Sequence, residues 1–170
     1  NVVLGAFFAY LSFPNIWNIY GYWPLAWVSV IPFMKALEGQ SPVRRLGLGS
    51  LYGLILYTLL LLWLFPLHVP GASAFVLAMS IQPVLFSVFY SRAITRSLVD
   101  AQSSPARNSA VVVFVPALWA ASEYVRTMIL GGFAWGLGYS QSFQPAFIQL
   151  AAAAGPYGVS FVIILVNVLI

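Results

Sequence analysis

The run from Leu46 to Phe65 contains no charged residue and is long enough to cross a lipid bilayer as one helix. About 20 helical residues rise roughly 30 Å, which is the thickness of the hydrocarbon core of a membrane. The composition agrees, because 62% of the 170 residues are hydrophobic and only 6% are charged, whereas soluble domains carry roughly 25% charged residues. The sequence therefore predicts an integral membrane protein.

Further apolar stretches predict an all-α, polytopic integral membrane bundle of about six spans, the first of them truncated. They are Val2–Phe13, a short stretch within Trp17–Met34 beginning near Trp23, Ser73–Ser91, Ala110–Leu130 and Ala151–Ile170. Gln82 and Pro83 interrupt the fourth span, which a transmembrane helix tolerates when neighbouring groups satisfy the freed backbone. Because the chain begins with Asn rather than Met and stops inside an apolar run, we expect residues 1–170 to be a fragment cut at both ends.

The basic residues follow the positive-inside rule, which concentrates Lys and Arg in cytoplasmic loops. Of the seven Lys and Arg, all but Arg126 lie between the second and third spans or between the fourth and fifth. These residues are Lys35, Arg44, Arg45, Arg92, Arg96 and Arg107. This pattern predicts a cytoplasmic N-terminus and puts the glycine-rich stretch 131–141 outside. Because the basic residues form no stripe with interleaved polar contacts, the net charge of +4 indicates no nucleic-acid partner.

Aromatic residues cluster at two of the outer turns that this topology defines. The clusters are Trp17, Tyr20, Tyr22, Trp23 and Trp27, and Phe133, Trp135, Tyr139 and Phe143. Amphipathic rings gather at the depth of the lipid headgroups. We therefore expect both clusters at the outer membrane interface.

Glu123 and Arg126 place two charges inside a predicted span. Residues three apart share a face of a helix and can pair, and the residue count puts Glu123 about 20 Å into the membrane, within the outer third of its core. An uncompensated charge in mid-membrane costs roughly 2.5–3.5 kcal/mol on insertion scales. Two interpretations stay open, a structural pair that locks one helix and a polar anchor beneath a headgroup or substrate site.

Other features predict packing or loops rather than chemistry. The spacing of Gly49 and Gly53 allows a second helix to approach closely, and Pro83 and Pro116 are read as helix kinks. His68 is the single histidine, and with no second ligand or carboxylate nearby in the sequence we expect it in a solvated loop.

The chain contains no recognisable catalytic machinery. It has no cysteine, which excludes a cysteine nucleophile or a zinc-thiolate site within these residues. Ser140 and Ser160 lack the complete glycine frame of a nucleophile elbow and a His and acid to complete a triad. No phosphate-binding glycine loop with Lys and no paired-His metal motif occurs. We therefore expect no metal, no cofactor and no catalytic residue in this chain.

Three stretches resemble, in this order and spacing, the N-terminal membrane part of bacterial apolipoprotein N-acyltransferases. They are LSFPNIWNIYGYWPLAWVSVIPF (11–33), PALWAASEYVRTMILGGFAWGLGYSQ (116–141) and IQLAAAAGPYGVSFVIILVN (148–167). The most specific element is an E-Y-x-R helix followed by G-F-x-W and G-Y-S-Q, matched by Glu123, Tyr124, Arg126, Gly132, Phe133, Trp135, Gly138, Tyr139, Ser140 and Gln141. Ala134 departs from the family pattern, which usually has a proline there that would stiffen the turn by fixing φ.

The resemblance implies a multi-pass enzyme of the bacterial inner membrane. Such an enzyme moves an acyl chain from a phospholipid to the N-terminal amine of a diacylglyceryl-cysteine in a lipoprotein. It also implies a nitrilase-like domain downstream, in which a Glu acts as base, a Lys supports the oxyanion and a Cys forms a thioacyl intermediate. Because this chain has no Cys and its only lysine, Lys35, is assigned to the cytoplasmic side, the fragment alone is predicted to be inactive.

Our hypothesis is that the outer rim contacts substrate or lipid through Glu123, Arg126, Trp135, Tyr139 and Gln141, because aromatic residues cluster on the side without basic residues. The membrane part would then hold the catalytic domain against the bilayer and help form a lateral entrance for acyl chains at the outer ends of the third, fifth and sixth spans. Two other functions stay open. One is a small-solute transporter in which Glu123 and Arg126 line a pathway, and the other is a noncatalytic membrane anchor.

Overall fold

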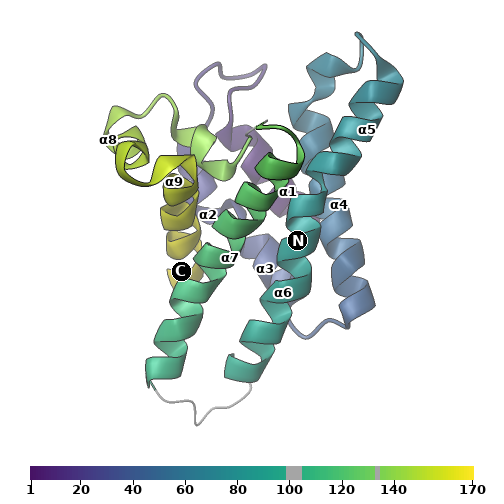
Figure 1. The fold of residues 1–170 in the computed structure, drawn as a ribbon. Coiled ribbons are helices and arrows are strands. Elements are labelled where there is room, and N and C mark those ends of the chain that lie inside the picture. Colours follow the sequence, from purple (N-terminus) through teal and green to yellow (C-terminus); the bar gives the residue numbers. More distant parts are fainter. Residues whose placement is uncertain (99–104, 133–134) are drawn as a thin grey trace.

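The computed structural model describes residues 1–98, 105–132 and 135–170, apart from the side chains of residues 91–98 and 105–111. Every regular element within these ranges is a helix. The long helices run roughly side by side as a bundle (Figure 1). The all-α membrane bundle that the sequence predicts is therefore confirmed.

The helices are short near the N-terminus and longer afterwards. They are α1 Val2–Ser12, η1 Trp23–Leu25, α2 Ala26–Ser29, α3 Ile31–Leu37, α4 Pro42–Leu60, η2 Leu62–Leu64, α5 Val69–Met79, α6 Ile81–Leu98, α7 Pro105–Ile129, η3 Leu137–Gln141, α8 Pro145–Ile148 and α9 Leu150–Leu169. α7 packs against α6 and α9, while α4 packs against α1 and α6. The bundle is thus built around the α4, α6, α7 and α9 contacts, with α1, α2 and α3 filling one side.

Three helical segments in the described ranges are long and apolar enough to cross a membrane. They are Val69–Tyr90, which runs through α5 and α6, Val112–Ile129 within α7, and Leu150–Leu169, which is α9. Two further segments, Val2–Ser12 and Trp23–Leu37, are apolar but shorter. The predicted number of about six spans therefore rests on three long segments, these two shorter ones and α4.

The helix α4 is displaced from the uncharged run on which the sequence prediction rested. It begins at Pro42 and ends at Leu60, and the 3-10 turn η2 follows. The Ser41 side chain accepts a hydrogen bond from the backbone N–H of Arg44, and Pro42 suits the first helical turn, where its missing N–H needs no partner. Capping acts through hydrogen bonds that a hydropathy count does not register. The helix therefore starts four residues early and takes in both Arg44 and Arg45.

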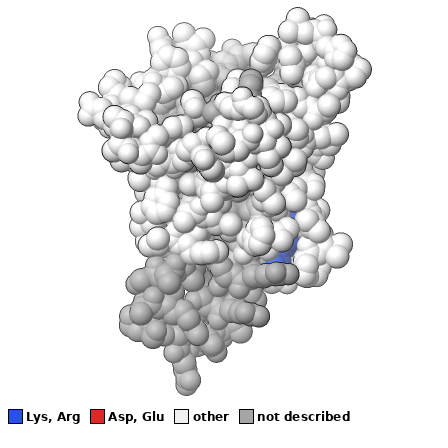
Figure 2. Space-filling model, viewed as in Figure 1, with Lys and Arg blue, Asp and Glu red and all other residues white. Residues whose placement is uncertain are grey.

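The two basic regions lie at one end of the bundle. The turn between α3 and α4, the C-terminal end of α6 and the N-terminal end of α7 all lie at the lower end in Figure 1. On the described part of the face in view, Figure 2 shows basic surface only near this end and no acidic surface. We call the opposite end, where α1 leads into η1, α4 into α5 and α7 into η3, the outer end. This arrangement agrees with the predicted alternation of loops, and the cytoplasmic assignment of the lower end stays a prediction.

The predicted close approach at Gly49 and Gly53 is present between α4 and the start of α6. A Cβ placed on Gly53 would lie 2.8 Å from Ser80 Cβ and 2.8 Å from Pro83 Cγ. Both distances are far shorter than van der Waals contact, so only glycine lets the helices come this close. The role of these glycines in packing is therefore confirmed.

Asn167 of α9 is inserted into the break between α2 and α3. Its side-chain Oδ1 accepts a hydrogen bond of 2.9 Å from Val30 N, and its Nδ2 donates to Ala26 O at 3.1 Å. In an uninterrupted helix, an N–H and a C=O four residues apart bond to each other. Asn167, only 2% exposed, satisfies both groups and ties the shorter N-terminal helices to α9.

Candidate functional site

Glu123 binds the backbone of residues 135–141, which we call the outer loop. It lies on α7 and is only 1% exposed. Its Oε1 accepts one hydrogen bond of 2.8 Å from Trp119 Nε1, one turn earlier on the same helix, and another of 2.7 Å from the backbone N–H of Leu137. A carboxylate oxygen with two N–H donors is well suited to remain in a buried site, because hydrogen bonds to a charged group compensate for lost water.

Arg126 binds the same loop and also joins three helices. It is 1% exposed, and its Nη1 donates to Tyr57 OH on α4 at 2.6 Å and to the carbonyl oxygen of Trp135 at 3.4 Å. Tyr57 OH in turn donates to Gln82 Oε1 on α6 at 3.1 Å, and Gln82 Nε2 donates to Ser122 Oγ on α7 at 3.4 Å. The guanidinium is therefore held inside the bundle by a polar network that crosses α4, α6 and α7.

Glu123 and Arg126 share one face of α7, as their spacing predicts, but each has its own partners. The structure gives no direct ion pair between these two described side chains; one binds an N–H of the loop and the other binds a C=O. Three of their buried polar atoms, Glu123 Oε2 and Arg126 Nε and Nη2, have no hydrogen-bond partner. The opposite charges nevertheless compensate each other within one turn of a helix.

The glycines of the outer loop permit this close contact. A Cβ on Gly136 would lie 2.5 Å from Glu123 Oε2, so the backbone rests directly on the carboxylate. Gly138 donates its N–H to Ser160 Oγ on α9 at 2.7 Å, and a Cβ there would meet Pro156 O and Ser160 N. The segment 135–141 is thus held from α7 and from α9 together, with no room for side chains at these two positions.

Gln141 closes the far end of this segment. It is fully buried, and its Nε2 donates to Trp23 O at 3.2 Å and to Ser140 Oγ at 2.8 Å. Its Oε1 is one of the buried atoms without a partner. Gln141 therefore links the outer loop to η1.

Trp135 forms part of the wall of two cavities at the outer end. One has a volume of about 240 Å³ and is lined by Phe13, Pro14, Trp135, Tyr139 and Ser142. The other, of about 420 Å³, is lined by Trp135, Tyr10, residues of the loop after α1 and residues of the α4–η2 junction. Both cavities contain Pro14 and Trp135, so these two residues lie between them.

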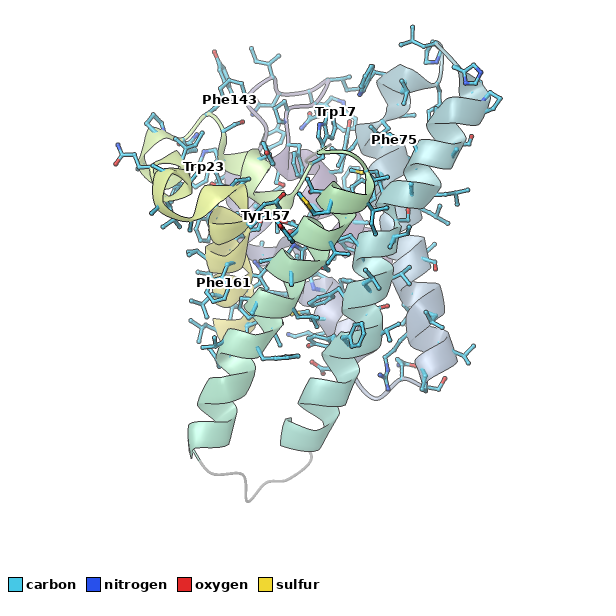
Figure 3. All side chains as sticks on the ribbon, in the orientation of Figure 1. Trp17, Trp23, Phe75, Phe143, Tyr157 and Phe161 are labelled. Carbon is cyan, nitrogen blue, oxygen red and sulfur yellow. The ribbon has the colours of Figure 1, made fainter. Side chains whose placement is uncertain are left out.

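The two predicted aromatic clusters meet at the outer end. The rings of Tyr20 and Phe143 lie 5.3 Å apart between centroids. Those of Trp23 and Trp27 lie 5.6 and 5.1 Å from Phe147, a residue that the prediction did not include. Figure 3 shows Trp17, Trp23 and Phe143 toward this end of the bundle. Phe133, which the sequence placed in the second cluster, and Ala134 lie outside the described residues.

The sequence prediction identified the charged and aromatic residues of the site but missed their partners. Tyr57, Gln82, Trp119 and Ser160 carry no motif of their own, and three of them lie on other helices. Only the i to i+4 spacing of Trp119 and Glu123 was readable in advance. Whether Glu123, Arg126 and Gln141 contact substrate stays a prediction, and the structure buries all three.

The two cavities and the buried polar network occupy different parts of the outer end. In the ranges that the structure describes, no three His, Cys, Asp or Glu residues come together to bind a metal ion. The two cavities have mainly apolar neighbours, with the polar network packed beneath the loop rather than in their walls. Fold and site together define a polytopic membrane domain with apolar cavities at one end.

Comparison with known proteins identifies the family. Residues 5–169 match the family described as Apolipoprotein N-acyltransferase N-terminal domain, and the chain belongs to this family. Apolipoprotein N-acyltransferase of Geobacter metallireducens is 31% identical over 171 residues, which cover 99% of this chain and 32% of that protein.

Two further relatives also match most of this chain over a small part of their own length. Apolipoprotein N-acyltransferase 1 of Treponema denticola is 29% identical over 95% of this chain and 28% of its own length. Apolipoprotein N-acyltransferase of Rhodopirellula baltica is 30% identical over 85% of this chain and 26% of its own length. The chain therefore spans about a third or less of the curated relatives that it matches. No solved structure matches it significantly.

Proposed function

We propose that residues 1–170 form the N-terminal membrane domain of a full-length N-acyltransferase of the bacterial inner membrane, with the basic end of the bundle in the cytoplasm. The full enzyme transfers an acyl chain from a phospholipid to the free amine of a diacylglyceryl-cysteine in a lipoprotein. A cysteine thiolate attacks the ester carbonyl and releases the lysophospholipid; the amine then attacks the thioester, forms the amide and regenerates the thiol. Because these residues include no cysteine, the nucleophile belongs to a nitrilase-like domain downstream, and this chain alone is inactive.

Within that enzyme, the membrane domain holds acyl chains at its outer end. The observation that carries this role is the position of Trp135, which is shared by both outer cavities. Their volumes of about 240 and 420 Å³ are near or within the range of roughly 300–1,000 Å³ typical of small-molecule sites. Tyr139 lines the smaller cavity and is 39% exposed, so its ring can contact both a bound chain and the interface. A lipid tail in these cavities would lie on the side opposite the basic loops, where the catalytic domain is expected.

The test is to replace Trp135 and Tyr139 by alanine in the full-length enzyme and to measure acyl transfer from phospholipid to a diacylated peptide. Removing an aromatic wall takes away apolar contact area, so we expect the KM for phospholipid to rise about tenfold for Trp135→Ala. Phe143→Ala is the matched control, because Phe143 is an exposed aromatic residue of the same loop region that lines neither described cavity.

The outcomes distinguish lipid contact by Trp135 and Tyr139 from a role of these residues in anchoring the protein at the membrane interface. Normal membrane insertion with unchanged kinetics in both variants would refute the lipid contact and leave the two aromatics as interfacial residues. An equal rise of the KM in the Phe143→Ala control would point to a general disturbance of the outer end. Acyl transfer by residues 1–170 alone would contradict the assignment of the chemistry to a downstream domain.

A further inference from the structure

The charged residues of the E-Y-x-R helix are directed at the loop backbone, not at the cavities. Neither Glu123 nor Arg126 lines either of the two described cavities, and each is 1% exposed. Their hydrogen bonds run to the amide of Leu137 and the carbonyl of Trp135, two backbone groups on either side of Gly136. With the loop in place, both side chains are therefore separated from the two described cavities.

We propose that Glu123 and Arg126 are positioning residues, which set the place of Trp135 in the shared cavity wall and affect lipid binding only through it. The inference rests on the proposed function for its kinetic part. The acid and the base bind backbone groups of opposite polarity, so each charge meets a dipole of the appropriate sign. Inside a membrane-embedded site of low dielectric, such bonds are stronger than at a water-exposed surface.

The loop packs so closely against α7 that the two hydrogen bonds with Glu123 and Arg126 suffice to hold it in place. The Gly136 backbone lies against the Glu123 carboxylate, where a Cβ would come within 2.5 Å of Oε2. On the other side, the Gly138 N–H is fixed to Ser160 of α9 at 2.7 Å. Trp135 is therefore the residue just before a short segment fixed to both α7 and α9, and its ring follows the position of that segment.

A spin label measures the position of the loop without any activity assay. The label is attached at Ser142→Cys in the full-length protein, with any other cysteine replaced, because Ser142 is exposed and follows η3 directly. We expect Glu123→Ala and Arg126→Ala to increase label mobility clearly, and Glu123→Gln, which keeps an acceptor oxygen, to restore most of the order. Thr127→Val is the matched control on the same buried turn, because the Thr127 hydroxyl bonds only to its own helix in the described contacts.

A double-mutant cycle on lipid binding tests whether the effect passes through Trp135. Loss of a hydrogen bond to a charged group corresponds to roughly a tenfold to hundredfold change in an equilibrium constant. We expect Glu123→Ala and Trp135→Ala each to raise the KM for phospholipid about tenfold, with kcat changed by less than about twofold. The double variant should then stay within about twofold of Trp135→Ala.

Three results would overturn either the positioning role or the proposed function. Unchanged label mobility in both alanine variants would overturn the positioning role, even if the full-length protein showed no acyl transfer. A double variant with a KM raised about a hundredfold would overturn it as well, because additive losses mean that Glu123 contacts the lipid independently. A mobile label together with a wild-type protein that lacks acyl transfer would refute the proposed function and leave the positioning of the loop intact.

Discussion

Replacing Gly136 by alanine tests the contact between the loop and the buried carboxylate most directly. The backbone of Gly136, at φ −79° and ψ 163°, is in a region that alanine adopts without strain. The obstacle is purely spatial, because the new Cβ would lie 2.5 Å from Glu123 Oε2 and 2.8 Å from Cδ. The loop must move away, and the 2.7 Å bond from Leu137 N to Glu123 is the first to lengthen.

The magnitude follows from the two losses together. Overpacking a tight site costs about 1–3 kcal/mol, and loss of a hydrogen bond to a charged group costs about 1.5–3 kcal/mol. We therefore expect Gly136→Ala to lower the free energy of unfolding by about 2.5–6 kcal/mol, measured by denaturant unfolding of the purified protein in detergent micelles. Gly47→Ala is the control, because nothing lies within 4 Å of a Cβ at that helical position, and it should be neutral or stabilising by up to about 1 kcal/mol.

A second substitution tests whether the Glu123 carboxylate is the group that obstructs the new Cβ. Glu123→Asp withdraws the carboxylate by one methylene and makes space, so the double variant Gly136→Ala, Glu123→Asp should recover part of the stability that Gly136→Ala loses. If Gly136→Ala unfolds at the same denaturant concentration as the wild type, the backbone does not rest on the carboxylate and the described geometry of the loop is wrong.

Two further substitutions test the packing that supports the site. Asn167→Leu removes the amide that bonds Val30 N and Ala26 O, so the free energy of unfolding should fall by about 2–4 kcal/mol in the same denaturation assay; an unchanged midpoint would mean that the amide is dispensable. Gly53→Leu places a large side chain where a Cβ alone would already lie 2.8 Å from Ser80, and we expect it to separate α4 from α6 and to abolish accumulation of folded protein, measured by size-exclusion chromatography. Gly47→Ser, at an open position of α4 without a positive φ, should leave the chromatographic profile unchanged.

Sequence reasoning located the helices well but not their ends. Hydropathy registers where side chains prefer lipid, and it found the spans α5–α6, α7 and α9 to within a few residues. It could not register the Ser41 cap that starts α4 before its two arginines. Likewise, His68 was expected in a solvated loop; it is exposed, and its Nδ1 accepts the N–H of Gly71 as the cap of α5.

At the candidate site, too, the sequence predicted what depends on neighbouring residues and missed what depends on residues far away in the chain. The spacing of Glu123 and Arg126 placed both on one face of α7, which depends only on helix geometry. Their partners Tyr57 and Leu137 depend on how helices and loops pack, and Tyr57 lies 69 residues from Arg126. The sequence showed only that the stretch 131–141 is rich in glycine, but at Gly136 and Gly138 the decisive property is the missing Cβ.

The insertion of Asn167 into the α2–α3 break has a consequence for the order of membrane assembly. Val30 and Asn167 are 137 residues apart, so at about 5–20 residues per second the ribosome needs roughly 7–30 s to make the second after the first. During that interval, Val30 N–H and Ala26 C=O can bond to each other as in an ordinary helix. We infer that residues 26–37 enter the membrane as a more continuous helix, which opens only when α9 arrives, so a span made much later completes the shape of an earlier segment.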